Sequence, residues 1–260
     1  FSPLLFFFGC RLSCSSRQPG VWDVSFRVIA LKCQIFSKRS RSIAMKTRDR
    51  ILEASLQLFN EQGERAVTTN HIAAHLGMSP GNLYYHFRNK QQIIAELFDH
   101  YERELEDSLA LPTDRGLDLD DKARYVESLS ESLWRYRFLQ RDLEHLLASD
   151  AQVAERYRLF SRRALRAVEG IFQGTIDAGI LDARYANAEV LALNSWLLMN
   201  SWTNFLCTTV LTDPQAQLTP QMQRRAVYQV LAQELGLLSD AARPRVEAML
   251  REYYAELPEA

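Results

Sequence analysis

The segment SPGNLYYHFRNK, residues 79–90, combines hydrogen-bonding side chains with two small residues at its start. Leu83 and Phe87 are four residues apart, so a helix would point both to one apolar side. The opposite side would then present Pro80, Gly81, Asn82, Tyr85 and His86. Amide and phenol groups can reach base edges in a DNA major groove, and small residues allow a helix N-terminus to approach a phosphate closely. This chemistry predicts a nucleic-acid contact.

The preceding residues supply a helix and a turn that would position this segment. Thr69 is a suitable N-cap, so we expect a helix to begin there. Its apolar face would be formed by Ile72, Ala73 and Leu76. Gly77 stands where a helix ends in a left-handed residue, which glycine adopts without steric cost. The sequence therefore predicts a short helix that ends in a tight turn.

A second helix is predicted to start directly after this turn. Ser79 is its expected N-cap, and Pro80 occupies the first helical position, where a missing N–H is harmless. Ala73, Gly77 and Leu83 then provide a small residue at the helix crossing, a turn glycine and an apolar anchor. This order is that of a helix-turn-helix.

One further helix is expected before this unit, over Thr47 to Gln62, with Gly63 ending it. Its buried stripe would consist of Ile51, Ser55, Leu58 and Phe59. Lys46 and Arg48 lie near its start and could either reach phosphates or remain solvated charges. We expect the rest of this helix to be scaffold.

The stretch LGMSPGNLYYHFRNK, preceded by TTNHIAAH and ILEASLQLFNEQG, closely resembles the DNA-binding domain of TetR/AcrR-family transcriptional repressors. The resemblance covers residues 47–92. It implies phosphate contacts by Thr69, Tyr84, His86 and Lys90. It implies a groove-facing set of Asn70, Pro80, Gly81, Asn82 and Tyr85. Lys46 and Ser79 complete the candidate DNA contacts, and part of the Tyr84 ring could instead belong to the core.

The histidines of this region also allow a different interpretation. His71 and His75 are four residues apart on one helical face, which is a spacing that metal ligands use. No cysteine or carboxylate cluster completes such a set, and exposed or phosphate-facing histidines are the commoner case. We therefore expect no metal site and no cofactor.

Composition favours an all-α fold. The chain has 260 residues, is 47% hydrophobic and 24% charged, and holds only 10 glycines and 8 prolines. Residues 46–90 carry six Lys and Arg against four acids, whereas residues 91–260 carry 18 against 27. Because an acidic body is repelled by nucleic acid, DNA contact is expected on one face of the helix-turn-helix.

Residues 1–44 differ from the rest of the chain. They contain Cys10, Cys14 and Cys33 and a Ser/Arg-rich run, and Met45 is followed by the periodic sequence KTRDRIL. We interpret them as a non-native or disordered leader. A basic DNA-binding arm, a signal peptide and a metal site at the first two cysteines are weaker alternatives.

The remaining chain is read as helices joined by short turns, with domains predicted at residues 45–92 and 93–260. Helices are expected over residues 90–109, 120–147 with a break near Arg137, 150–178, 186–211, 220–235 and 240–254. No stretch reaches the length of consecutive apolar residues that a membrane span requires. The fold expected is a three-helix DNA-binding domain followed by a helical ligand-binding and dimerisation domain.

The resemblance implies a ligand cavity and a dimer contact in the second domain. Aromatic residues with a nearby amide are candidates for the cavity, although burial in the core is their default: Trp134, Phe138, Tyr157, Phe160, Trp196 and Asn200. A four-helix contact between two copies would use residues 186–211 and 220–235. Its candidate residues are Trp202, Phe205, Val227 and Leu231, for which burial within one chain is the alternative.

Signatures of catalysis are missing from the sequence. It has no G-x-S-x-G, no phosphate-binding glycine loop and no Cys-x-x-Cys pair. The expectation is a cytoplasmic, homodimeric repressor that binds a palindromic operator in double-stranded DNA and responds to an unidentified small molecule. A transcriptional activator, an architectural DNA-binding protein without ligand control, and a helical enzyme or binding module with an incidental helix-turn-helix remain alternatives.

Overall fold

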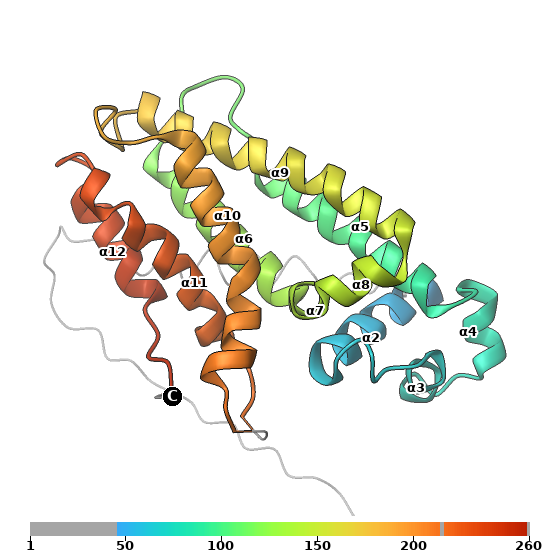
Figure 1. Cartoon of the computed structure of the whole chain (residues 1–260). Coiled ribbons are helices and arrows are strands. Elements are labelled where there is room, and N and C mark those ends of the chain that lie inside the picture. Colours follow the sequence, from blue (N-terminus) through green and yellow to red (C-terminus); the bar gives the residue numbers. More distant parts are fainter. Residues whose placement is uncertain (1–45, 214–215, 259–260) are drawn as a thin grey trace, which may run out of the picture. The chain divides into compact units, whose positions relative to one another are not determined.

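The computed structural model describes residues 46–213 and 216–258, and within these ranges the chain is helical (Figure 1). The pairing of Leu181 with Leu238 is an isolated β-bridge, and no strand forms among the described residues. None of the described helices is both long enough and apolar enough for a membrane span. The all-α fold is confirmed, while the predicted leader, residues 1–44, lies outside the described residues.

The helices form an N-terminal head, residues 46–89, and a C-terminal body, residues 109–213 and 216–258, with one long helix between them. They are α2 (Thr47–Gln62), α3 (Thr69–His75), α4 (Pro80–His86), α5 (Lys90–Ser108), α6 (Leu119–Arg135), α7 (Arg137–Arg141), α8 (Leu143–Ser149), α9 (Ala151–Asp177), α10 (Ala188–Phe205), α11 (Pro220–Gln233) and α12 (Arg243–Tyr253). A π-helical turn, Leu206–Val210, extends α10, and a 3-10 turn, Leu235–Leu237, follows α11.

The α3–α4 turn forms as its residue types predict. Gly77 adopts a left-handed φ of 63°. The backbone N–H of Gly77 donates to the Ala74 carbonyl at 3.1 Å, and that of Met78 donates to the Ala73 carbonyl at 3.0 Å. This is the hydrogen-bond pattern of a Schellman ending. Ser79 then caps α4 by accepting from the Asn82 N–H at 3.2 Å.

The cap of α3 differs from the prediction by one residue. Thr68, not Thr69, is the N-cap, and its Oγ1 accepts from the His71 N–H at 3.2 Å. The His71 Nδ1 in return accepts from the Thr68 N–H at 3.4 Å, which completes a capping box. The prediction of a cap at Thr69 is wrong because two adjacent threonines are equally good caps by type. The reciprocal bond from His71 selects the first of them.

Replacing Thr68 with alanine is expected to lower the free energy of unfolding by about 1 kcal/mol, because the first turn of α3 loses its cap. Asn70→Ala is the matched control, since Asn70 is exposed in the same turn. Urea denaturation followed by circular dichroism measures both. Equal stability of the two variants would contradict the assignment of the cap to Thr68.

The long helix expected over residues 120–147 is divided into three. α6 ends at Arg135 and α7 ends at Arg141, so the break predicted near Arg137 is found together with a second one. Asp142 is held by the head, because its Oδ2 accepts from the Glu64 N–H at 3.1 Å. α9 ends as predicted, with Gly179 at a φ of 67°.

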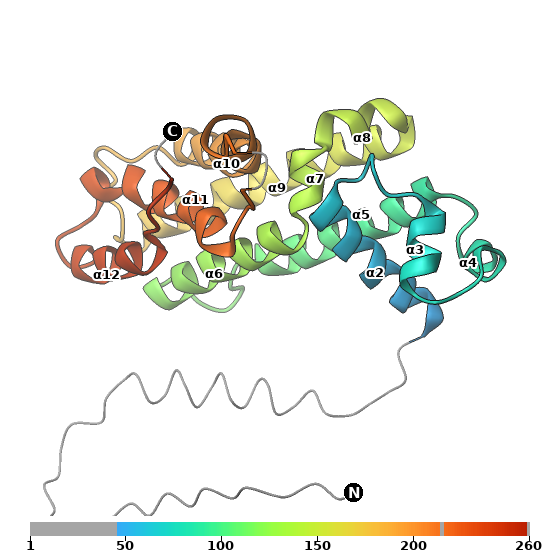
Figure 2. The ribbon, with the colours of Figure 1, turned by 90° about the horizontal axis from the view of Figure 1, so that it is seen from below.

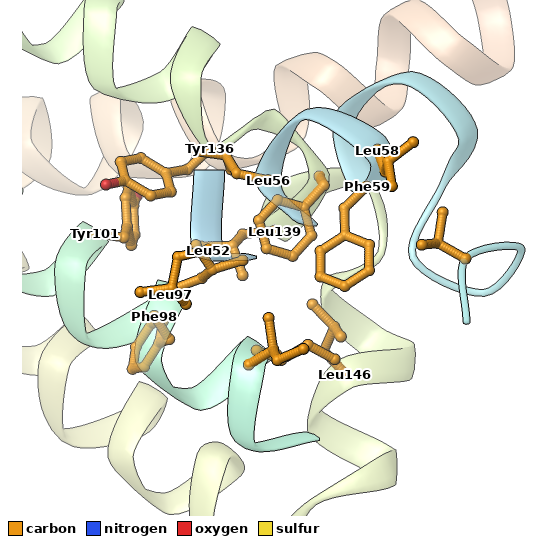
Figure 3. Close-up of a cluster of buried hydrophobic side chains, with 14 of the residues drawn as sticks. Leu52, Leu56, Leu58, Phe59, Leu97, Phe98, Tyr101, Tyr136, Leu139 and Leu146 are labelled. Atoms are coloured by element: carbon orange, nitrogen blue, oxygen red, sulfur yellow. The ribbon is translucent and has the colours of Figure 1, made fainter. Parts of the chain in front are cut away.

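Head and body share a core, and Figure 2 shows α7 beside α2. The rings of Phe59 from α2 and Phe138 from α7 lie with centroids 5.3 Å apart. Both belong to a buried cluster, of which Figure 3 shows Phe59, Tyr101 and Tyr136. The boundary predicted between residues 92 and 93 falls inside α5, which runs without interruption from head to body. A displacement of α7 would therefore act directly on α2 of the head.

Candidate nucleic-acid interface and ligand cavity

The second helix of the turn, α4, presents its polar side to solvent. Leu83 and Phe87 are fully buried, and Ile72 and Ala73 of α3 are buried with them. On the other side Asn82 is exposed, and the side chain of Tyr85 is 85% exposed. The predicted inward and outward sides of α4 are thus both found in the structure. An exposed aromatic flanked by an amide on a protruding helix is suited to reading base edges.

Two predicted phosphate-contacting hydroxyls lie together across the two short helices. The Thr69 Oγ1 and the Tyr84 hydroxyl are hydrogen-bonded at 3.0 Å. Tyr84 is exposed, so its ring is not a core residue. Because Thr69 is in the first turn of α3, the pair lies beside backbone N–H groups that have no helical partner. Such a place can hold a phosphate oxygen.

The Arg48 side chain makes contacts within the protein. Its Nη1 donates to the His86 carbonyl at 2.6 Å, and its guanidinium forms an ion pair with Glu96. The guanidinium also lies 4.2 Å from the centre of the Phe87 ring. Arg48 therefore ties the end of α4 to α2 and α5, and neither of the two roles considered from the sequence describes it.

The Lys90 side chain, predicted to contact a phosphate, forms internal contacts in this structure. Its Nζ donates to the Glu64 carbonyl at 3.0 Å and the Val67 carbonyl at 3.1 Å. The same Nζ pairs with the Glu64 Oε1 at 2.7 Å. These three partners account for the three protons of an ammonium. Lys90 therefore stabilises the loop before α3, and its phosphate contact stays a prediction.

The remaining predicted DNA contacts keep accessible positions. His86 is partly exposed, and its ring meets that of Tyr85 edge-on, with centroids 5.2 Å apart. The exposed members of the set are Lys46, Asn70, Ser79, Pro80 and Gly81. No group of three or more His, Cys, Asp or Glu with metal-binding geometry occurs in the part of the chain that the structure describes.

A cavity of about 90 Å³ lies inside the body, between α5, α6, α9, α10 and the end of α11. Trp196 and Asn200, both predicted from the sequence, are among its lining residues. The side-chain amide of Asn200 donates to the Trp196 carbonyl at 2.8 Å, which fixes its orientation. Apolar walls with a few polar groups are typical of small-molecule sites.

The other predicted cavity residues lie elsewhere. Phe138 and Phe160 are fully buried in the core shared by head and body. Trp134 lies outside the cavity and stacks on Arg137, whose guanidinium is 3.9 Å from the ring centre. Tyr157 lines a neighbouring space of about 20 Å³, which shares Tyr101 and Asn200 with the cavity. These four predictions are corrected, because aromatic residues were chosen by type although most aromatics fill cores.

Several cavity residues were not predicted, namely Tyr101, Lys122, Tyr125, Phe172 and Glu234. Burial raises the pKa of Tyr101 and Tyr125, so both hydroxyls remain protonated donors at neutral pH. A signal for Lys122 was present in the sequence. It lies four residues before Val126, on the apolar stripe that continues through Leu129 and Leu133.

The predicted dimer residues are mostly buried within the single chain. Val227 and Leu231 are buried in the body, and the buried Trp202 donates its Nε1 proton to the Met222 carbonyl at 2.9 Å. Of the four, Phe205 alone is exposed, at 40%. The apolar side chains that α10 leaves exposed are instead Val190, Leu193 and Leu197, together with Phe205. They recur at helical spacing along one face.

Comparisons with known proteins agree with this arrangement. Residues 51–97 match the family described as "Bacterial regulatory proteins, tetR family", and residues 100–246 match that described as "Bacterial transcriptional repressor". A solved TetR-family transcriptional regulator from Marinobacter aquaeolei VT8 is 45% identical, covers 81% of this chain and 100% of its own, and superimposes with a TM-score of 0.72.

Curated relatives are also transcriptional regulators. The regulator AcrR of Shigella flexneri is 23% identical over 69% of this chain and 85% of its own length. The repressor KstR2 of Mycobacterium tuberculosis is 37% identical over 26% of this chain and 38% of its own. The second family match spans more than half of the chain. The chain therefore belongs to the TetR family, as a DNA-binding transcriptional regulator and not an enzyme.

Proposed function

We propose that this protein is a homodimeric repressor that binds a near-palindromic operator and releases it when a small molecule enters the body. The observation that carries the proposal is the outward side of α4, where Asn82 and the 85% exposed Tyr85 are held on a rigid, capped helix. Two such helices would enter successive major grooves about 34–36 Å apart. The protein would act in the bacterial cytoplasm, where operator DNA lies.

The exposed face of α10 supports the dimer. Val190, Leu193 and Leu197 are large apolar side chains that a single chain leaves in water. Two copies related by a twofold axis would bury this face against itself, and the neighbouring Phe205 would lie at its end. Helix-on-helix contacts of this kind form four-helix arrangements when a second helix from each copy joins them.

The helices that connect the cavity to the head, α6 and α7, support ligand control. α6 carries the cavity residues Leu129 and Leu133 and leads directly into α7. α7 holds the end of α2, because the Arg141 guanidinium donates to the Phe59 carbonyl at 2.5 Å and Asn60 accepts from the Phe138 N–H at 3.1 Å. A ligand that favours a displaced α6 would change the spacing of the heads. DNA must then weaken ligand binding by the same factor.

The test is binding of the full chain to its own upstream intergenic DNA over a salt series. We expect tight binding to a palindromic segment, with affinity that falls steeply as salt rises. Equal binding to random DNA would favour an architectural protein without ligand control. A reporter fused to the same segment distinguishes repression from activation.

The double variant Asn82→Ala, Tyr85→Ala should bind this operator at least 30-fold more weakly, since each lost base contact costs about 1–3 kcal/mol. Its salt dependence should be nearly unchanged because the phosphate contacts remain. Gln57→Ala is the control, as Gln57 is exposed on α2 of the same head. Unchanged affinity of the double variant would refute the assignment of α4 as the recognition helix.

A further inference from the structure

The cavity in the body is apolar over most of its wall. Its aliphatic and aromatic lining comes from five helices and includes Leu105, Val126, Ile171, Phe172, Trp196 and Met199. Most of the polar groups near it are already engaged. The Tyr125 hydroxyl donates to the Ala110 carbonyl at 2.9 Å, and the Ser195 Oγ accepts from the Gln233 side chain at 2.6 Å.

The charged groups that line the cavity form an ion pair. The Lys122 Nζ lies 2.6 Å from the Glu234 Oε2, and the side chains are only 6% and 1% exposed. Both residues line the cavity. Within residues 46–213 and 216–258, the one hydrogen bond that the Lys122 ammonium donates goes to Glu234, which leaves ammonium protons for another acceptor. The Phe172 ring covers this ammonium at 5.8 Å.

The charge balance of this ion pair restricts what the cavity can hold. Lys122 and Glu234 together carry no net charge, so an ionised ligand would bring an uncompensated charge into an apolar site. Burying an unpaired charge is strongly unfavourable. A carboxylate would also meet Glu234, and an ammonium would also meet Lys122. An uncharged acceptor has neither penalty and can use the spare protons of Lys122.

Building on the proposed effector site, we propose that its ligand is an uncharged, mainly apolar molecule with one hydroxyl or carbonyl group, which accepts a hydrogen bond from Lys122. The volume of about 90 Å³ matches a small ring or short chain. The ligand would also contact Lys122 of α6 and Glu234 at the end of α11, whose ion pair joins these two helices. α6 leads into α7, which contacts the head, and α11 packs on α10, which carries the proposed dimer face. The Lys122–Glu234 ion pair is therefore linked through packed helices to both the DNA-binding head and the dimer face.

Four ring-sized probes test the class of ligand by calorimetry on the full chain: benzyl alcohol, toluene, benzoate and benzylammonium. Benzyl alcohol should bind most tightly, roughly tenfold or more above either ion. Glu234→Gln keeps the shape but leaves Lys122 unbalanced, so benzoate should then become the preferred probe. The double variant Lys122→Met, Glu234→Leu removes the ion pair, and benzyl alcohol should lose its advantage over toluene.

Preference of the unmodified protein for an ion, or failure of every probe to bind at about 10 mM, would overturn the proposal. So would a Glu234→Gln protein that folds and still prefers the alcohol. If Glu234→Gln does not fold, the double variant decides, because replacing a buried ion pair by apolar residues is commonly neutral or stabilising. Operator binding measured without probes reports separately on the proposed function, which survives if only the ligand preference fails.

Discussion

Replacing Leu197 with glutamate is expected to convert the protein to a monomer and to weaken operator binding about 100-fold or more, because the two heads no longer bind as a linked pair. Leu197 is 56% exposed at the centre of the apolar face of α10. In the proposed dimer a twofold axis would place the substitution on both copies, so two carboxylates would be brought into one apolar contact.

Leu159→Glu is the matched control. Leu159 is 46% exposed on α9, so the same substitution there adds the same charge outside the α10 face. Sedimentation and operator binding should be unaffected in this variant. A Leu197→Glu protein that sediments as a dimer would place the dimer contact elsewhere and would remove the support that α10 gives to the proposed function.

The two faces of α4 and the two faces of α10 differ in how well sequence could predict them. Leu83 in α4 and Phe87 directly after it are four residues apart with more polar residues between them, so the inward side follows from spacing alone. α10 is apolar almost all round, and apolarity then gives no direction. Trp202 was chosen for the dimer by its type, but it is buried within its own chain. Only the position of α9 and α11 decides that Leu197 remains outside.

The cavity shows a second limit of sequence reasoning. Trp196 and Asn200 are predicted because the family resemblance implies a cavity and because a large ring and an amide are typical cavity residues. Lys122 and Glu234 are more than a hundred residues apart, so nothing local indicates that they pair. The caps at Ser79 and Gly77 were predictable because they depend on neighbours in the chain. Contacts between distant helices depend on packing.

Phe138→Ala is expected to lower the free energy of unfolding by about 3–5 kcal/mol, the usual result of removing a buried phenylalanine ring. Phe138 is fully buried, and its ring lies against Phe59 of the head. The loss would leave a void between α7 and α2. Urea denaturation followed by circular dichroism measures the change, and operator binding under stabilising conditions measures its effect on the head.

Trp134→Ala is the control, because Trp134 is a larger aromatic that is only partly buried and stacks on Arg137 in the same region. Its loss should destabilise the protein less than the loss of the Phe138 ring, because part of the Trp134 ring is already in contact with water. Both residues were predicted from the sequence to line the cavity. If Phe138→Ala weakened benzyl alcohol binding while unfolding like Trp134→Ala, the ring would belong to the cavity wall. A large loss of stability would instead place the Phe138 ring in the core between α7 and the DNA-binding head, where it acts together with the hydrogen bonds of Arg141 to α2.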